Sequence, residues 1–286
     1  MNILKWHEQL VKKLRNFRHM HREYADRNRL LAYLQTIEWE DAEELRHFFS
    51  QHCFARVPYF WAEELSYLDV EVTFDEDKKM YYGDWNGRRL YWKRGETKRS
   101  VQRNIHYLRI EQLPQSPHRY LFPKDLPIAT AADLGAAEGS FALDIIDRVN
   151  HVYLFECDPE WAEPLAATFA PWKDKITIVS KYIGRTCDNE HTTLDEYFRD
   201  KPLDFIKADI EGAEVDAIAY GKETMQNKVR AAAICLYHRS TDENDVLSLL
   251  YECGYQCKVN PRHMFFHEGD NPKDWLRRGV VQAQRI

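Results

Sequence analysis

One contiguous stretch, residues 129–159, constrains the fold more than any other part of the chain. It reads ATAADLGAAEGSFALDIIDRVNHVYLFECDP. An apolar approach ends in Asp133, and Gly135 and Gly139 follow with three residues between them. A helical run comes next, and a second apolar run ends in Glu156. A strand, a glycine turn, a helix, a strand and an acid within about thirty residues have the size of one βαβ unit.

The same stretch predicts a ligand site. A glycine removes the side chain where a ligand must touch backbone. The helix after the turn offers unpaired N–H groups and a positive dipole end. An acid at the end of the second strand, here Glu156, can accept hydrogen bonds from both hydroxyls of a ribose. These features favour an adenosine-containing cofactor, and the alternative is a tight turn that binds nothing.

The residues between the glycines distinguish two kinds of cofactor. A dinucleotide site has the pattern G-x-G-x-x-G, with glycine packed under a pyrophosphate. This chain has D-L-G-A-A-E-G instead, with Ala137 and Glu138 in the loop. Asp133 and Glu138 would repel a pyrophosphate, whereas they suit the ammonium group of a methionine moiety. The sequence therefore predicts S-adenosylmethionine, and disfavours a nicotinamide-dependent oxidoreductase.

Composition sets the broad class. The 286 residues are 44% hydrophobic and 30% charged, which is ordinary for a soluble globular protein. The formal net charge of −6 gives no reason to expect a nucleic-acid partner. No apolar run approaches the roughly 18 residues of a membrane span, and no secretory signal is visible. The six cysteines form no C-x-x-C pair, so we expect a reduced, cytoplasmic protein without structural zinc.

The chain divides into a small α+β module, residues 1–115, a linker, residues 116–125, and a cofactor-binding domain, residues 126–286. The module begins with a basic helix to about residue 37, and a second helix covers residues 40–51. A strand at 70–74, a hairpin around Asn86-Gly87 and a helix at 98–112 follow. We expect the module to recognise the acceptor or to mediate homo-oligomer contacts through its first helix, which could equally pack on its own domain. The aromatic side chains of the hairpin could stack on an acceptor or simply pair across strands.

From residue 126 onward, strands and helices alternate, which indicates a parallel sheet. The predicted order is compatible with a seven-stranded sheet of the methyltransferase type whose last strands form a C-terminal hairpin. The strands after the first are expected at residues 152–155, 176–180, 203–209, 231–237, 255–259, 264–267 and 279–283, and the helices at 141–149, 161–169, 193–198, 213–220 and 244–253.

Ligands bind at the carboxyl ends of the strands of such sheets. Asp209 ends the fourth strand, and we expect it near the transferable methyl group. Glu211 and Glu214 are three residues apart, so they share a face if a helix has begun, although both could serve only that helix N-terminus. His238 ends the fifth strand and, like Asp209, is a candidate base for removing the proton of a hydroxyl. Asp209 and Glu211 could instead hold a divalent cation, but no second set of ligands is evident. The residues expected at this edge as cofactor contacts are Asp133, Gly135, Ala137, Glu138, Gly139, Glu156, Lys181 and Asp209, and the catalytic candidates are Asp209, Glu211 and His238.

Four motifs resemble the FkbM-type S-adenosylmethionine-dependent methyltransferases. They are DLGAAEGSF from residue 133, TLD from residue 193, DFIKADIEGAE from residue 204 and LYH from residue 236. The resemblance covers roughly residues 126–260. It implies a Rossmann-like class I methyltransferase fold and methylation of a hydroxyl on a sugar, polysaccharide or secondary metabolite, with S-adenosylhomocysteine as the second product. By position, it assigns Asp133, Gly135, Gly139 and Glu156 to the cofactor. The family often has Asn where this chain has Ala137, so any side-chain contact from that position is lost here. A cofactor-binding scaffold without activity is the alternative.

Overall fold

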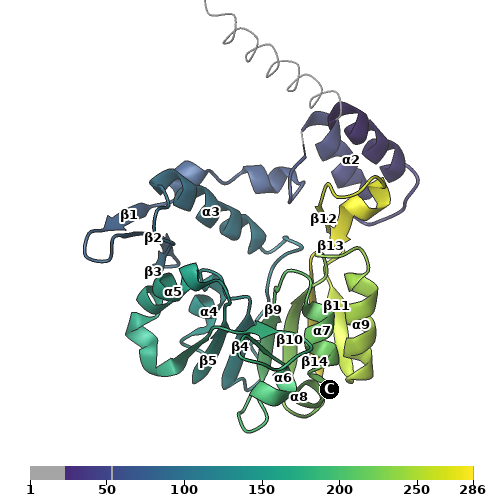
Figure 1. The fold of residues 1–286 in the computed structure, drawn as a ribbon. Coiled ribbons are helices and arrows are strands. Elements are labelled where there is room, and N and C mark those ends of the chain that lie inside the picture. Colours follow the sequence, from purple (N-terminus) through teal and green to yellow (C-terminus); the bar gives the residue numbers. More distant parts are fainter. Residues whose placement is uncertain (1–22, 53, 286) are drawn as a thin grey trace, which may run out of the picture.

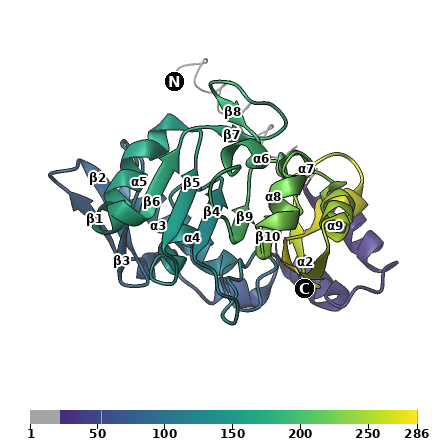
Figure 2. The ribbon, with the colours of Figure 1, turned by 90° about the horizontal axis from the view of Figure 1, so that it is seen from below.

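The computed structural model describes residues 23–52 and 54–285. The strands of its largest sheet are β4 (Thr130–Leu134), β5 (His151–Phe155), β6 (Ile176–Val179), β9 (Phe205–Ala208), β10 (Ala231–Cys235), β11 (Tyr255–Val259) and β14 (Val280–Arg285). They lie in the order β11-β14-β10-β9-β4-β5-β6. The five strands from β10 to β6 are parallel and lie side by side in Figure 2, and β14 runs antiparallel between β10 and β11. The predicted Rossmann-like α/β class and its seven-stranded sheet are confirmed.

Helices cover both faces of this sheet because its strands are apolar on both sides. In β10, Ala231 and Ala233 face one core, which also contains Phe141 of α4. Ala232 and Ile234 face the other core. The helices of the first face are α4 (Ser140–Ile145) and α5 (Ala162–Thr168), and those of the second face are α6 (Leu194–Tyr197), α7 (Glu214–Ala219), α8 (Lys222–Asn227) and α9 (Asp242–Glu252).

The predicted hairpin forms the second sheet, which packs on the first face. It contains β1 (Val72–Asp75), β2 (Met80–Trp85) and β3 (Arg88–Tyr91), and α3 (Lys98–Glu111) follows. Asn86 and Gly87 both have positive φ, as a type I′ turn requires. Trp85 Nε1 donates a hydrogen bond to Asp144 Oδ1 of α4 at 2.8 Å. Trp85 and Trp92 belong to the core shared with the large sheet, so these two rings serve packing rather than an exposed aromatic platform.

Among the described residues, the helices that precede the β2–β3 hairpin do not pack on the large sheet but on a C-terminal hairpin. Residues 23–34 are helical, and α2 (Ala42–Gln51) follows. Both lie against a small hairpin, β12 (His263–Phe265) and β13 (Leu276–Arg278), which is inserted between β11 and β14 (Figure 1). The strand expected at residues 264–267 forms at His263–Phe265 and lies outside the large sheet. Its residue Phe265 is buried against the N-terminal helices, and it pairs with β13 instead.

Residues 1–22 of the predicted basic helix lie outside the described residues, so its proposed role in homo-oligomer contacts stays a prediction. Between residues 23 and 285, Cys53 apart, no helix has the length and apolar character to cross a membrane. The remaining short elements are the strands β7 (Tyr182–Ile183) and β8 (His191–Thr192), which pair with each other, and the 3₁₀ turns Phe60–Glu63, Tyr67–Asp69, Pro159–Trp161, Ala170–Lys175 and Pro272–Trp275.

Candidate active site

Asp209, the residue after β9, is the centre of a network of polar side chains. Tyr120 Oη donates to Asp209 Oδ2 at 2.6 Å, and Tyr237 Oη lies 3.0 and 3.1 Å from the two carboxylate oxygens. His238 Nε2 lies 3.3 Å from Oδ1. Burial opposes ionisation, but His238, Lys207 and Tyr120 together hold the pKa of Asp209 far below its usual range. Asp209 is therefore a fixed negative charge at the carboxyl end of the sheet.

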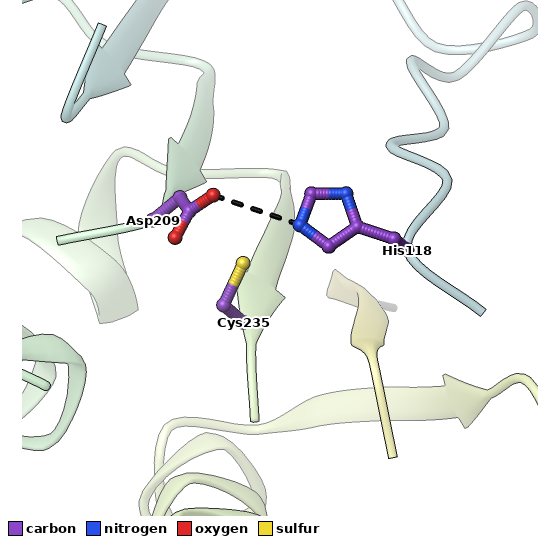
Figure 3. Close-up of side chains that lie close together, drawn as sticks. All are labelled: His118, Asp209 and Cys235. Atoms are coloured by element: carbon purple, nitrogen blue, oxygen red, sulfur yellow. Dashed lines mark ion pairs between the residues drawn. The ribbon is translucent and has the colours of Figure 1, made fainter. Parts of the chain in front are cut away.

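The predicted linker supplies part of this network. Residue Pro117 is anchored on β14, because Val280 N–H donates to its carbonyl at 3.0 Å. Gly279 permits this approach, since a Cβ there would lie 2.1 Å from that same oxygen. The anchored segment places His118 over the sheet, with Nε2 2.9 Å from Tyr237 Oη and 3.7 Å from Asp209 Oδ2. The His118 ring points toward Asp209 in Figure 3.

His118, Asp209 and Cys235 are close enough to share a metal ion (Figure 3). However, the Tyr120 hydroxyl lies among their ligand atoms, 2.6 Å from Asp209, 3.4 Å from His118 and 3.6 Å from the Cys235 thiol. A cation at usual ligand distances of about 2.0–2.3 Å would have to displace that hydroxyl. The geometry is that of a hydrogen-bond network around Asp209.

Asp209, Glu214 and His238 form a second group of this kind. Here the two ring nitrogens of His238 face different acids, because Nδ1 lies 3.0 Å from Glu214 Oε1 and Nε2 faces Asp209. Glu214 is fully buried at the start of α7, and its Oε1 also accepts the Ile210 N–H. Burial alone would lower the pKa of His238, but the two carboxylates raise it to about 10. The ring is thus an imidazolium that bridges two acids, which differs from the expectation of a neutral base at pH 7.

This raised pKa predicts a pH-dependent stability. The folded-state pKa of His238, about 10, exceeds the ordinary value of 6.5. The stabilisation is therefore complete below about pH 6.5 and is lost as the pH rises toward 10. We expect the free energy of unfolding to fall across this window, and to fall less steeply in His238→Gln, as measured by urea unfolding at several pH values. A His191→Gln variant, which changes an exposed histidine, should keep the wild-type slope. Equal slopes in all three proteins would contradict the assignment.

Glu211 lies at the mouth of this network. Its side chain is 94% exposed, and its carboxylate lies 3.7 Å from His238 Nε2. Glu211 has a φ of 54° and Gly212 one of 94°, so the chain turns sharply between β9 and α7. The turn leaves the Glu211 carboxylate in solvent, where an incoming molecule can meet it.

The glycine loop lies beside Asp209. A Cβ on Gly135 would be 1.9 Å from the Asp209 carbonyl oxygen, and one on Gly139 would be 2.7 Å from the Phe169 ring. Both glycines are thus required by close packing within the protein, in addition to any contact with a ligand. Ala137 has a φ of 45°, a conformation in which Asn is more common than Ala.

Glu156, after β5, holds this loop. Its Oε2 accepts the Ala137 N–H and its Oε1 accepts the Asp158 N–H, each at 2.8 Å. A carboxylate has about four acceptor positions, so two remain for further donors. The partly exposed carboxylate therefore fits the predicted contact with a pair of ribose hydroxyls.

Asp133 has a different environment from the one expected. It is 1% exposed and forms an ion pair with the buried Lys207 of β9, with 2.9 Å between Oδ1 and Nζ. Lys207 Nζ also donates to the Gly135 carbonyl at 2.6 Å. Burial alone would lower the pKa of Lys207, but Asp133 and Asp209 raise it, so the lysine keeps its charge. Asp133 is thus enclosed by protein and supports the glycine loop through Lys207.

Two further predicted cofactor contacts also have protein partners. Glu138 is buried and accepts a hydrogen bond from Ser140 Oγ at 2.6 Å. Lys181 is half-buried, and its Nζ donates to the Asp188 carbonyl at 2.8 Å in the β7–β8 excursion. Gly135, Asp209 and Glu156 lie at the carboxyl ends of β4, β9 and β5, whereas the Lys181 ammonium is bound to Asp188.

The sequence reasoning missed Lys207, Tyr120, His118 and Tyr237. One signal could have revealed His118 and Tyr120, because residues 116–120 have unusually many polar and aromatic side chains for a linker. The other signal is Lys207 itself, a lysine in an otherwise apolar strand, since a buried lysine requires an acidic partner.

Residues 87–257 match the sequence model of the methyltransferase FkbM domain. This span covers more than half of the 286 residues. The chain belongs to the FkbM methyltransferase family. The FkbM assignment confirms the resemblance found in the four motifs, and the match includes the glycine loop, Glu156, Asp209 and His238.

Solved structures similar to this FkbM-family chain are distant in sequence. Methyltransferase FkbM from Methylobacillus flagellatus KT is 21% identical with a TM-score of 0.47, and the match covers 66% of this chain and 55% of that one. Precorrin-6y C5,15-methyltransferase from Geobacter metallireducens GS-15 is 14% identical with a TM-score of 0.40, covering 62% and 87%. Magnesium protoporphyrin IX methyltransferase from Synechocystis PCC 6803, solved with bound SAM, is 12% identical with a TM-score of 0.38, covering 57% and 72%. Among curated proteins, no sequence gives a significant match.

Proposed function

We propose that the protein is an S-adenosylmethionine-dependent O-methyltransferase that acts on a hydroxyl of a sugar, polysaccharide or secondary metabolite. The observation that carries this proposal is the position of two acids, Glu156 and Asp209, which both lie against the glycine loop. Glu156, after β5, has free acceptor positions for a ribose, and Asp209, after β9 on the other side of β4, is a fixed negative charge. Membership of the FkbM family supports methyl transfer.

The chemistry expected of the bound cofactor is donation of a methyl group from its sulfonium to a nucleophile. Asp209 would orient the acceptor hydroxyl by accepting its hydrogen bond. As the bond between the acceptor oxygen and the methyl carbon forms, the hydroxyl proton becomes strongly acidic, so even a carboxylate with a low pKa can take it. Tyr120 and Tyr237 hold the Asp209 carboxylate in place by donating to it. His238, which is already protonated, stabilises the charge of Asp209 and is a positioning residue in this scheme.

The direct test is calorimetric titration with S-adenosylmethionine, S-adenosylhomocysteine and NAD. We expect the two methionine-derived ligands to bind and NAD not to bind. Glu156→Gln should raise their dissociation constants by roughly tenfold to a hundredfold, since it weakens charge-assisted hydrogen bonds to the ribose. Its amide oxygen can still accept the Ala137 N–H, so the glycine loop should persist, while the Asp158 N–H loses its acceptor. Glu160→Gln, at a neighbouring exposed acid, is the matched control and should bind like the wild type.

Binding of NAD alone would overturn the proposal, and unchanged affinity in Glu156→Gln would place the ribose elsewhere. Turnover then separates an enzyme from an inactive scaffold. Incubation with labelled S-adenosylmethionine and fractionated glycans or metabolites, followed by mass spectrometry, should give a methylated product that is absent without the protein.

A further inference from the structure

A cavity of about 520 Å³ lies between α2, the segment after it and the C-terminal half of α3. Its walls are mainly apolar, and they include Phe48, Phe54 and Ile110. A few polar side chains interrupt them, among which are Arg56 and Glu111. The volume and the composition are those of a site for a small organic molecule.

Two chains of side-chain contacts connect the walls of the cavity to the Asp209 network. Glu111 Oε2 lies 3.8 Å from His118 Nδ1, and His118 contacts Tyr237 and Asp209 through its other nitrogen. His118 Nδ1 is buried and has no hydrogen-bond partner of its own. In the second chain of contacts, Phe266 stacks on Tyr237 with 5.1 Å between ring centroids, and Arg56 lies 4.1 Å above Phe266. One layer of side chains thus separates the cavity from Asp209.

The charges in the cavity indicate what it can bind. Across residues 23–52 and 54–285, no carboxylate lies within ion-pair distance of Arg56. Glu63 is instead paired with His52 at 2.9 Å, and Glu111 is turned toward His118. Burial lowers the pKa of His106 on the cavity wall, which favours its neutral form. Arg56 is therefore the only lysine or arginine among the described residues that line these walls, and it has no ion-pair partner there, whereas Glu63 and Glu111 each have a histidine neighbour.

Arg56 is also preorganised. Its guanidinium lies on the Phe266 ring, and its carbonyl accepts the Phe265 N–H at 2.9 Å. A planar guanidinium held in this way favours a carboxylate or phosphate, which it can bind through two parallel hydrogen bonds. A second hollow of about 300 Å³, lined by Arg99 and Arg103, shares Tyr107 with the cavity, so these two positive charges lie nearby.

We propose that this cavity binds the methyl acceptor, and that the acceptor carries an anionic group, a carboxylate or a phosphate, that pairs with Arg56. This rests on the proposed function, since the hydroxyl to be methylated would extend from the cavity toward Asp209. The apolar walls would hold the body of the acceptor, and the side chains of Glu111 and His118, which separate the cavity from Asp209, would have to move aside for the hydroxyl to reach the reacting centre.

The test measures binding of defined probes to the full chain, with and without S-adenosylhomocysteine, by saturation-transfer NMR. The probes are methyl glucuronide, glucose 1-phosphate and neutral methyl glucoside. At least one anionic probe should bind roughly tenfold more tightly than the neutral one, and Arg56→Gln should remove that difference. Which anionic probe wins distinguishes carboxylate from phosphate. Arg56→Lys should retain part of the preference. Arg199→Gln, at an exposed arginine of another surface, should bind like the wild type.

The location is tested separately by Ala55→Trp, which fills the cavity without changing its charge and should block every probe. Arg56→Gln and Ala55→Trp should both keep the wild-type affinity for S-adenosylhomocysteine. Equal binding of anionic and neutral probes, an unchanged preference in Arg56→Gln, or no binding of any anionic probe would overturn the proposal. Failure of the proposed function would appear differently, as loss of S-adenosylhomocysteine binding by the wild type.

Discussion

Asp209→Asn is expected to lower the rate of methyl transfer by roughly a hundredfold to ten-thousandfold, the range typical of a lost general base. The amide has the same shape and can still accept the hydrogen bond from Tyr120, but it carries no charge to orient the acceptor hydroxyl or to take its proton. Asp209 lies between the glycine loop and the histidines, whereas Glu156 is the residue placed to hold the ribose. The affinity for S-adenosylmethionine should therefore change little.

The measurement pairs single-turnover rates with calorimetric titration of the cofactor. Asp216→Asn, at an acid of α7 that pairs with Arg185, is the matched control and should retain both properties. An equal loss of rate and cofactor affinity in Asp209→Asn would make Asp209 a cofactor ligand. A rate close to wild type would remove it from the chemistry altogether.

Lys207→Met is expected to cost about 3–5 kcal/mol of folding free energy, because it leaves a buried carboxylate without its partner. Asp133 is 1% exposed and Lys207 5% exposed, so solvent cannot replace the lost charge. The Gly135 carbonyl also loses the hydrogen bond from Lys207 Nζ. We therefore expect weaker cofactor binding in any Lys207→Met protein that remains folded.

Urea unfolding at neutral pH measures this effect. The double variant Asp133→Asn/Lys207→Met should recover a large part of the loss, since it removes both charges together. Lys222→Met breaks an exposed pair with Glu252 and should leave the unfolding midpoint almost unchanged. If Lys207→Met unfolded at the same urea concentration as Lys222→Met, the buried pair would have no role in stability.

Much of the fold could be predicted from local patterns. Strands β5 and β10 are mainly apolar runs, and Asn86-Gly87 is a short-range turn signal that the structure bears out. The hairpin β12–β13 could not be placed in this way. A short apolar strand does not show which sheet it joins, and Phe265 and Leu276 pack on N-terminal residues more than 200 positions away.

For the site, the sequence alone determined that Gly135, Gly139, Glu156 and Asp209 meet at the carboxyl edge of one sheet. These residues belong to strand ends whose order follows from the βαβ rule, so their approach is a consequence of connectivity. Only the tertiary structure decided what surrounds Asp209. Tyr120 is 89 positions away along the chain, and Tyr237 is 28.

The same distinction applies to charge. The sequence places Asp133 two residues before Gly135 and His238 at a strand end. It cannot show that Asp133 faces Lys207 or that His238 lies between two carboxylates. The pKa of an ionisable group depends on burial and on charges within a few ångströms, whatever their separation along the chain. Local pattern therefore determined where the site lies, and long-range packing decided which of its groups are charged and which remain open to a ligand.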